Sequence, residues 1–80
     1  MWYVYILKSK VKEWRYVGYT GNLKSRLKQH NAGESLATKP YLPFELKSFV
    51  AVEDEETAIK LEKYFKTGSG IAWMNKRLLS

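Results

Sequence analysis

The feature that most constrains this 80-residue chain is the continuous run of apolar and aromatic residues at positions 2–7, WYVYIL. Such a run is typical of a β-strand that is covered on both faces. It is far too short to span a bilayer, and it lacks the basic lead and the small-residue cleavage site of a signal peptide. Residues 2–7 are therefore predicted to form the central strand of a sheet.

The pattern that follows predicts a second strand, a helix and a third strand. Residues 14–19 form the second strand, and the short polar loop over residues 8–13 favours an antiparallel hairpin. Asn22 is a good N-cap for a helix over residues 23–31. The third strand is predicted over residues 44–52.

Local signals also mark where the helices begin and end. Gly33 can take the left-handed conformation that ends the first helix. A looser segment with two prolines follows over residues 34–43. Asp54 is predicted to cap a second helix that ends near Gly68, with acidic residues facing the positive end of the helix dipole. Ser69 is then a candidate cap for a last short helix.

The element order β-β-α-β-α-α predicts an α/β fold. We expect one domain over residues 1–80, in which helices flank a small, three-stranded, mostly antiparallel sheet. A chain of this length buries only roughly 60–65% of its unfolded surface, so its core is small. The sequence has no cysteine, which excludes disulfides and thiolate metal sites and favours a cytoplasmic location.

The distribution of charge points to a polyanionic partner. The net charge is +6, and half of the eight acidic residues lie in the run 53–56. The rest of the chain is therefore strongly basic, which is the pattern expected of a protein that binds nucleic acid. The alternative is that the positive charge serves solubility alone.

The first helix carries a guanidinium and an imidazole beside its apolar stripe. At about 100° per residue, Arg26 and His30 lie roughly 60° and 20° from Leu23, which must face the sheet. A lone histidine beside apolar residues is more often structural than catalytic. Two groups that can both be cationic are unfavourable side by side without an anion, however, so this pair favours an anion-binding role.

The second helix places a carboxylate inside its apolar arc. Glu62 lies about 40° from Ala58, between residues that must face the core. Burying a bare carboxylate costs several kcal/mol, so it must be paired, hydrogen-bonded, protonated or bound to a metal. Pairing with Lys66 at i+4, or extension to solvent, explains the position as well as a metal does.

Strand alternation predicts that phenols gather on the hairpin. Tyr3 and Tyr5 share one face of the first strand, and Tyr16 shares a face of the second strand with Gly18. Tyrosine is a good strand former, so the phenols alone indicate little. Gly18 either leaves room for a close ligand or backbone, or marks the end of a strand.

With these residues in view, the chain resembles the GIY-YIG nuclease superfamily. The two family motifs correspond to residues 3–5 (YVY) and 16–18 (YVG), the turn and helix to residues 20–31, and the glutamate segment to residues 58–70. Tyr3 stands where the family name has glycine. The chain looks most like short, single-domain bacterial members related to the N-terminal nuclease domain of the UvrC repair protein.

The resemblance implies a role for each of five residues. Tyr5 is the candidate general base on the attacking water, and His30 assists it. Tyr16 positions the phosphate or the water, Arg26 neutralises charge on the scissile phosphate, and Glu62 holds a divalent metal, Mg²⁺ or Mn²⁺. One carboxylate is enough for such a metal, because Mg²⁺ fills its other positions with water and substrate oxygens. A two-metal mechanism would need more carboxylates.

Other candidate residues lie outside this group of five. Asn75 is the only late candidate for the asparagine that family members often carry near the C-terminus. The cations expected to contact nucleic acid are Lys24, Lys28, Lys39 and Lys66.

The function expected from these implications is metal-dependent endonucleolytic hydrolysis of phosphodiester bonds. DNA is favoured as the substrate, and DNA repair or recombination as the setting. A tyrosine base is demanding, since lowering a phenol pKa from about 10 to about 7.5 needs roughly 3.4 kcal/mol. The alternative is a nucleic-acid-binding module that no longer cuts, which would bind in a salt-sensitive way without metal. A third possibility is an interaction domain whose basic surface is solvated and binds no nucleic acid. The sequence does not decide whether a protein partner or a second copy of the chain takes part.

Overall fold

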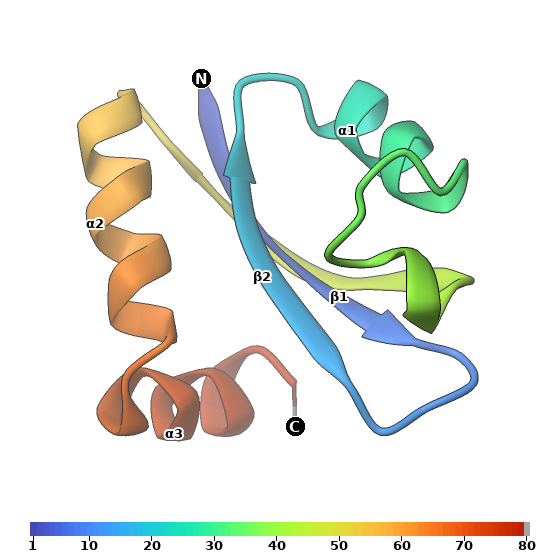
Figure 1. Ribbon diagram of the computed structural model, residues 1–80. Coiled ribbons are helices and arrows are strands. Elements are labelled where there is room, and N and C mark those ends of the chain that lie inside the picture. Colours follow the sequence, from blue (N-terminus) through green and yellow to red (C-terminus); the bar gives the residue numbers. More distant parts are fainter. Residues whose placement is uncertain (80) are drawn as a thin grey trace.

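The computed structural model describes residues 1–79, in which three strands form one antiparallel sheet in the order β2-β1-β3 (Figure 1). The strands are β1 (Trp2–Ser9), β2 (Arg15–Thr20) and β3 (Phe44–Val52). β1 lies in the middle and pairs antiparallel with both neighbours. The central position predicted for the apolar run is therefore confirmed.

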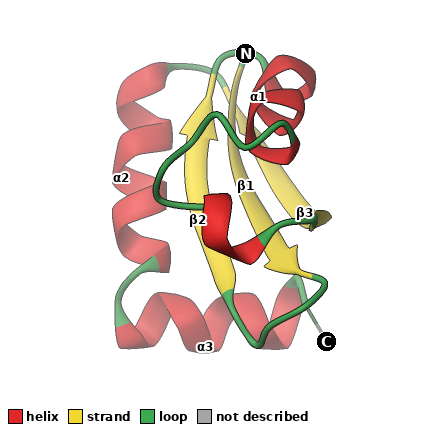
Figure 2. Cartoon of the chain, turned by 45° about the vertical axis from the view of Figure 1, so that its right-hand side comes forward, coloured by secondary structure: helices red, strands yellow, loops and turns green. Residues whose placement is uncertain are grey.

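Helices cover both faces of this sheet. The helices are α1 (Leu23–Asn31), α2 (Glu55–Phe65) and α3 (Gly68–Arg77), and a short 3-10 helix, η1 (Lys39–Tyr41), follows α1. Figure 2 shows α1 and η1 on one side of the strands and α2 on the other. The element order and the fold class predicted from the sequence are confirmed.

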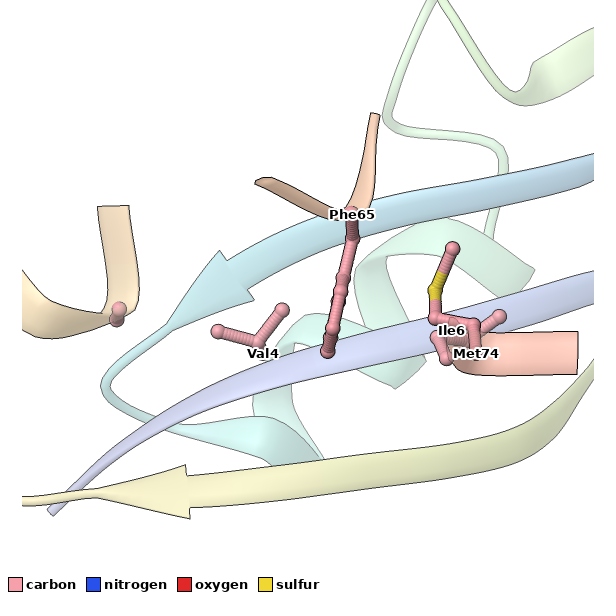
Figure 3. Close-up of a cluster of buried hydrophobic side chains, with 5 residues drawn as sticks. Val4, Ile6, Phe65 and Met74 are labelled. Atoms are coloured by element: carbon pink, nitrogen blue, oxygen red, sulfur yellow. The ribbon is translucent and has the colours of Figure 1, made fainter. Parts of the chain in front are cut away.

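The two faces of β1 enter two separate apolar clusters. On one face, Val4 and Ile6 pack against Phe65 of α2 and Met74 of α3, and Phe65 extends from its helix toward β1 between the two aliphatic side chains (Figure 3). All four side chains are nearly inaccessible to solvent. Burial on this face holds α2 and α3 against the sheet, at about 25 cal/mol for each Å² of apolar surface removed from water.

The opposite face of β1 carries Tyr5 and Leu7, which pack with Phe44 and with the two leucines of α1, Leu23 and Leu27. Leu23 and Leu27 therefore face the sheet, as their helical spacing predicts. A strand with alternate residues in two different cores has no solvated face, which explains why residues 2–7 are apolar throughout.

The predicted caps of the first two helices are observed. The Asn22 side chain accepts the backbone N–H of Ser25 at 3.0 Å, and Asp54 accepts that of Thr57 at 2.8 Å. The chain leaves α1 through Gly33, which has a φ of +76°, the left-handed conformation expected there. These signals act within one turn, so they do not depend on the rest of the fold.

The cap predicted for the last helix is wrong. Thr67, not Ser69, caps α3, because its hydroxyl accepts the backbone N–H of Gly70 at 3.1 Å. Ser69 lies inside the first turn. A helix start with two glycines is unfavourable by propensity, but α3 crosses α2 so closely that a Cβ at position 70 would overlap the carbonyl of Tyr64. Tertiary packing therefore sets this boundary.

Smaller differences concern element ends. β1 continues to Ser9, β2 begins at Arg15 rather than Trp14, and α2 ends at Phe65 rather than near Gly68. In the part of the chain that is described, no helix has the length and apolar character needed to cross a membrane.

Candidate active site

The site is organised around Tyr5, whose phenol crosses from the central strand to the edge of the sheet. Tyr5 pairs directly with Gly18 of the edge strand β2. A Cβ at position 18 would lie 2.6 Å from the phenolic oxygen, closer than real carbon atoms approach. Gly18 lies inside β2 and not at its end, and the group that approaches it is the side chain of Tyr5 and not the ligand or backbone that the sequence analysis considered.

Two side chains of α1 contact the phenolic oxygen. Nε2 of His30 lies 2.9 Å from it, and Nε of Arg26 donates a longer hydrogen bond of 3.4 Å. Because the two residues are one helical turn apart beside the apolar stripe, both side chains reach over the sheet toward Tyr5. The helix thus supplies an imidazole nitrogen and a fixed positive charge to one oxygen atom.

Behind His30 lies a hydroxyl that sequence reasoning missed. Nδ1 of His30 is 2.9 Å from Oγ1 of Thr38, and both side chains are buried. Thr38 belongs to the segment predicted only as a loose connection. It is the N-cap residue of η1, but its side chain makes no capping hydrogen bond there. The chain Tyr5–His30–Thr38 joins a strand, a helix and a loop.

Burial and charge set the protonation states of the free site. Burial raises the pKa of Tyr5, and the hydrogen bond from Arg26 opposes this rise only in part. Burial, and secondarily the charge of Arg26, lower the pKa of His30. The phenol is therefore protonated and the imidazole neutral near pH 7, so the free protein does not itself lower the pKa of Tyr5 as a phenolate base requires.

Tyr5 lines a groove at the outer edge of β2, which we call the edge groove. Residues of the β1–β2 hairpin, of the turn after it, of α1, and of α2 with its C-cap line this groove. They are Trp2, Tyr5, Tyr16, Val17, Gly18, Tyr19, Thr20, Gly21, Arg26, Gln29, Glu62 and Lys66. Four of the five residues singled out by the resemblance therefore line one groove, and the fifth, His30, lies behind Tyr5.

Tyr16 forms one wall of the edge groove. Its ring lies 6.2 Å from that of Tyr5 and 5.2 Å from that of His30, measured between centroids. Gln29, a second residue that the sequence did not point to, accepts a hydrogen bond of 3.1 Å from the Arg26 guanidinium. These contacts fix the orientation of Arg26 and leave further N–H donors free for an anion.

Glu62 reaches the edge groove from α2, on the opposite face of the sheet from α1. Its side chain is only 14% exposed, and its carboxylate forms an ion pair with Lys66, with 2.7 Å between Oε1 and Nζ. The i+4 pairing that the sequence left open is thus present, and the carboxylate also faces the groove. A cation therefore already lies against this carboxylate.

The donor set fits one oxygen-preferring divalent ion and no more. Within residues 1–79, no three histidine, aspartate or glutamate side chains gather in one place. Glu62 is the one carboxylate lining the edge groove in that part of the chain. Mg²⁺ is commonly held by one or two carboxylates with waters and substrate oxygens, so Glu62 is a sufficient protein ligand for one ion.

The remaining candidates do not join this group. Asn75 accepts a hydrogen bond of 2.7 Å from Arg15 and lines a different cavity, toward the start of β2. Lys66 is the only one of the four proposed nucleic-acid contacts that lines the edge groove as described. Lys24 lines a separate surface depression on α1, and the other two, Lys28 and Lys39, are exposed.

Comparison with known proteins agrees with this geometry. The model of the GIY-YIG catalytic domain family matches residues 1–75, so the chain belongs to the GIY-YIG family, as the sequence motifs predict. At the level of the family this is a nuclease domain, for which nucleic acid is the substrate and a divalent metal is typical.

The relatives found by sequence are short bacterial proteins. A UPF0213 protein of Bacillus cereus is 40% identical over 52 residues, which are 64% of this chain and 54% of that protein. A UPF0213 protein of Streptococcus pyogenes serotype M3 is 38% identical over 65 residues, which are 80% of this chain and 70% of that protein. The match thus spans only about half of the Bacillus relative. These names state no activity, and no solved structure matches the chain.

Proposed function

We propose that this chain is an endonuclease that hydrolyses phosphodiester bonds with the help of one divalent metal ion, Mg²⁺ or Mn²⁺, and that DNA is its substrate. One observation supports this proposal above others. The Tyr5 oxygen is held between the Nε2 of His30, at 2.9 Å, and the guanidinium of Arg26, at a groove that also presents the carboxylate of Glu62. Binding alone does not need this set.

In the proposed mechanism, Tyr5 and His30 move the proton of the attacking water. The Tyr5 oxygen takes a proton from water as its own phenolic proton passes to Nε2 of His30, and the resulting hydroxide attacks phosphorus. This coupling suits a site in which burial lowers the pKa of His30 and raises the pKa of Tyr5, since a neutral imidazole can accept a proton and a phenol of raised pKa needs an acceptor. As the new P–O bond forms, the scissile P–O bond breaks and the leaving oxygen takes up a proton from solvent water. The proton on Nε2 of His30 then passes back to Tyr5 as Tyr5 releases one to solvent, which restores the site.

Arg26 and Glu62 act on the charge of the phosphate. The planar guanidinium of Arg26 donates to phosphate oxygens in a way that a lysine cannot reproduce. Glu62 would hold the metal ion, which supplies positive charge that stabilises the phosphate as negative charge builds up. Lys66 must then leave the carboxylate, and its exposed ammonium is free to contact the nucleic acid backbone.

The test is cleavage of labelled single-stranded, duplex and branched DNA and RNA with Mg²⁺, Mn²⁺ or EDTA. We expect cleavage that depends on metal and is lost in Glu62→Ala and Glu62→Gln, while binding is nearly unchanged. Glu56→Gln is the matched control, since Glu56 also lies on α2 and also pairs with a lysine at i+4, at 3.3 Å, but is 80% exposed. Equal cleavage by wild type and the Glu62 variants would refute the metal role.

A second candidate function has one observation in its favour. The 2.7 Å ion pair with Lys66 neutralises Glu62 without a metal, as expected of a binding module that no longer cuts. This alternative predicts salt-sensitive binding that persists in EDTA and no cleavage with any metal. In either case we propose that residues 1–80 act as one domain. The cytoplasmic location inferred from the absence of cysteine, and a role in DNA repair or recombination, stay predictions.

A further inference from the structure

The hydroxyl of Thr38 is hydrogen-bonded to one ring nitrogen of His30, so it can influence which of the two nitrogens carries the proton. Oγ1 of Thr38 lies 2.9 Å from Nδ1, and the Tyr5 oxygen lies 2.9 Å from Nε2. All three side chains are at most 1% exposed, so the imidazole of His30 is shielded from water between its two partners. Both ring nitrogens are therefore engaged, each by a group that can donate or accept.

With the proton on Nδ1, every hydrogen in this chain of contacts has an acceptor. Nδ1–H donates to Thr38, whose own hydroxyl donates to the Ser35 carbonyl at a long 3.5 Å. The Tyr5 phenol donates to Nε2, and Arg26 donates to the Tyr5 oxygen. The Ser35 carbonyl also accepts two backbone N–H groups, so it lies at a fixed place in the turn before η1.

With the proton on Nε2, the same contacts do not balance. The Tyr5 oxygen would then accept from both His30 and Arg26. Its own hydrogen would have no acceptor among the residues described, since no other polar group there is hydrogen-bonded to it. A hydroxyl hydrogen that has no acceptor in the protein is unfavourable. More importantly, Nε2 would have no lone pair to take the phenolic proton.

We propose that Thr38 is a positioning residue that holds His30 as the Nδ1–H tautomer and so keeps Nε2 available as the proton acceptor for Tyr5. The tautomer itself follows from the contacts alone, whereas its consequence for turnover rests on the function proposed above. Thr38 lies too deep to touch the substrate. It acts through His30, much as a buried hydrogen-bond partner fixes the tautomer of a catalytic histidine elsewhere.

The tautomer can be measured directly, because His30 is the only histidine in the chain. We would label the free protein with ¹⁵N-histidine and record the ring nitrogens by NMR at pH 7.5 without metal or nucleic acid. We expect a proton-bearing Nδ1 and a proton-free Nε2. A proton on Nε2 would overturn the inference, whether or not the protein cleaves any substrate. A correct tautomer in a protein that cleaves nothing would refute the proposed function instead.

Two variants link the tautomer to turnover. Thr38→Val keeps the shape of the side chain but removes the hydroxyl, and Thr38→Ser keeps the hydroxyl. We expect the Nδ1–H signal to be lost or reduced in Thr38→Val, and kcat to fall about 10- to 100-fold with little change in KM. Thr38→Ser should keep both the signal and most of the rate. An unchanged tautomer and rate in a folded Thr38→Val protein would contradict the role, and if that variant does not fold, a Thr38→Ser protein that lacks the Nδ1–H signal would do the same.

Discussion

Gly18 lies directly opposite Tyr5 in the pairing of β2 with β1, and the phenol of Tyr5 fills the space that a side chain at position 18 would need. A Cβ there would lie 2.6 Å from the phenolic oxygen and 2.9 Å from the ring of Tyr16. The edge strand therefore lacks a side chain at the one point where the central strand must reach past it. This close approach places a buried residue's oxygen at the edge groove.

Replacing Gly18 with alanine should consequently displace the phenol rather than unfold the sheet. We expect a destabilisation of about 1–3 kcal/mol from overpacking. We expect kcat to fall about 100-fold, since small displacements of a catalytic group have effects of that size. Gly68→Ala is the control, because nothing lies within 4 Å of a Cβ at position 68. Cleavage kinetics and thermal unfolding of both variants test this, and full activity of Gly18→Ala would show that the contact is not needed.

Tyr5→Phe removes only the hydroxyl between His30 and Arg26. We expect cleavage to fall by at least about 10²-fold, the lower range for loss of a general base. The free energy of unfolding should change by only about 1–3 kcal/mol, because His30 loses one buried hydrogen-bond partner. Tyr3→Phe serves as the control, since Tyr3 lies two residues away on the same face of β1 and does not line the edge groove. An active Tyr5→Phe protein would remove Tyr5 as the base.

Arg26→Lys keeps the charge of the side chain but loses the planar guanidinium, which contacts both Tyr5 and Gln29. We expect kcat to remain roughly 10²-fold below wild type, as for the loss of one donor to a developing charge. Arg15→Lys is the comparison, because Arg15 pairs with Asn75 in a different cavity. Nearly normal rates for Arg26→Lys would mean that positive charge suffices.

The depressed pKa of His30 predicts how stability and activity change with pH. Burial and the charge of Arg26 lower this pKa in the folded protein below the value of about 6.5 expected in the unfolded chain. Between these two values the unfolded state binds more protons, so the free energy of unfolding falls as the pH decreases below about 6.5. Activity should fall only below the folded-state pKa, where His30 can no longer accept a proton.

Urea unfolding between pH 7 and 5.5 measures this dependence above the range in which most carboxylates titrate. His30→Gln should unfold with a smaller dependence on pH over the same interval, and direct titration of the His30 ring by NMR gives the folded-state pKa even if that variant is unstable. A ring that titrates above pH 6.5 would contradict the prediction.

Much of the framework was readable from short stretches of sequence because it depends on local physics. Asn22 and Asp54 cap their helices through hydrogen bonds that span three residues, and Gly33 takes the left-handed conformation that ends α1. The apolar run over residues 2–7 predicted a strand with both faces buried, because none of its side chains favours contact with water. The spacing of Arg26 and His30 on one helix, together with the tyrosines of the hairpin and the helical Glu62, was sufficient to indicate the family and to propose a candidate site.

Contacts between distant segments were not readable in this way. Ser69 was predicted to cap the last helix, but Thr67 does so where α3 packs against α2. Asn75, the uncertain late candidate, lies beside Arg15 in a different cavity. The sequence around Thr38 does not indicate its 2.9 Å contact with His30, because a different element supplies that histidine. Local rules specify which residues form a helix or a strand, whereas the meeting of α1, α2 and the hairpin at one edge depends on how the two cores pack.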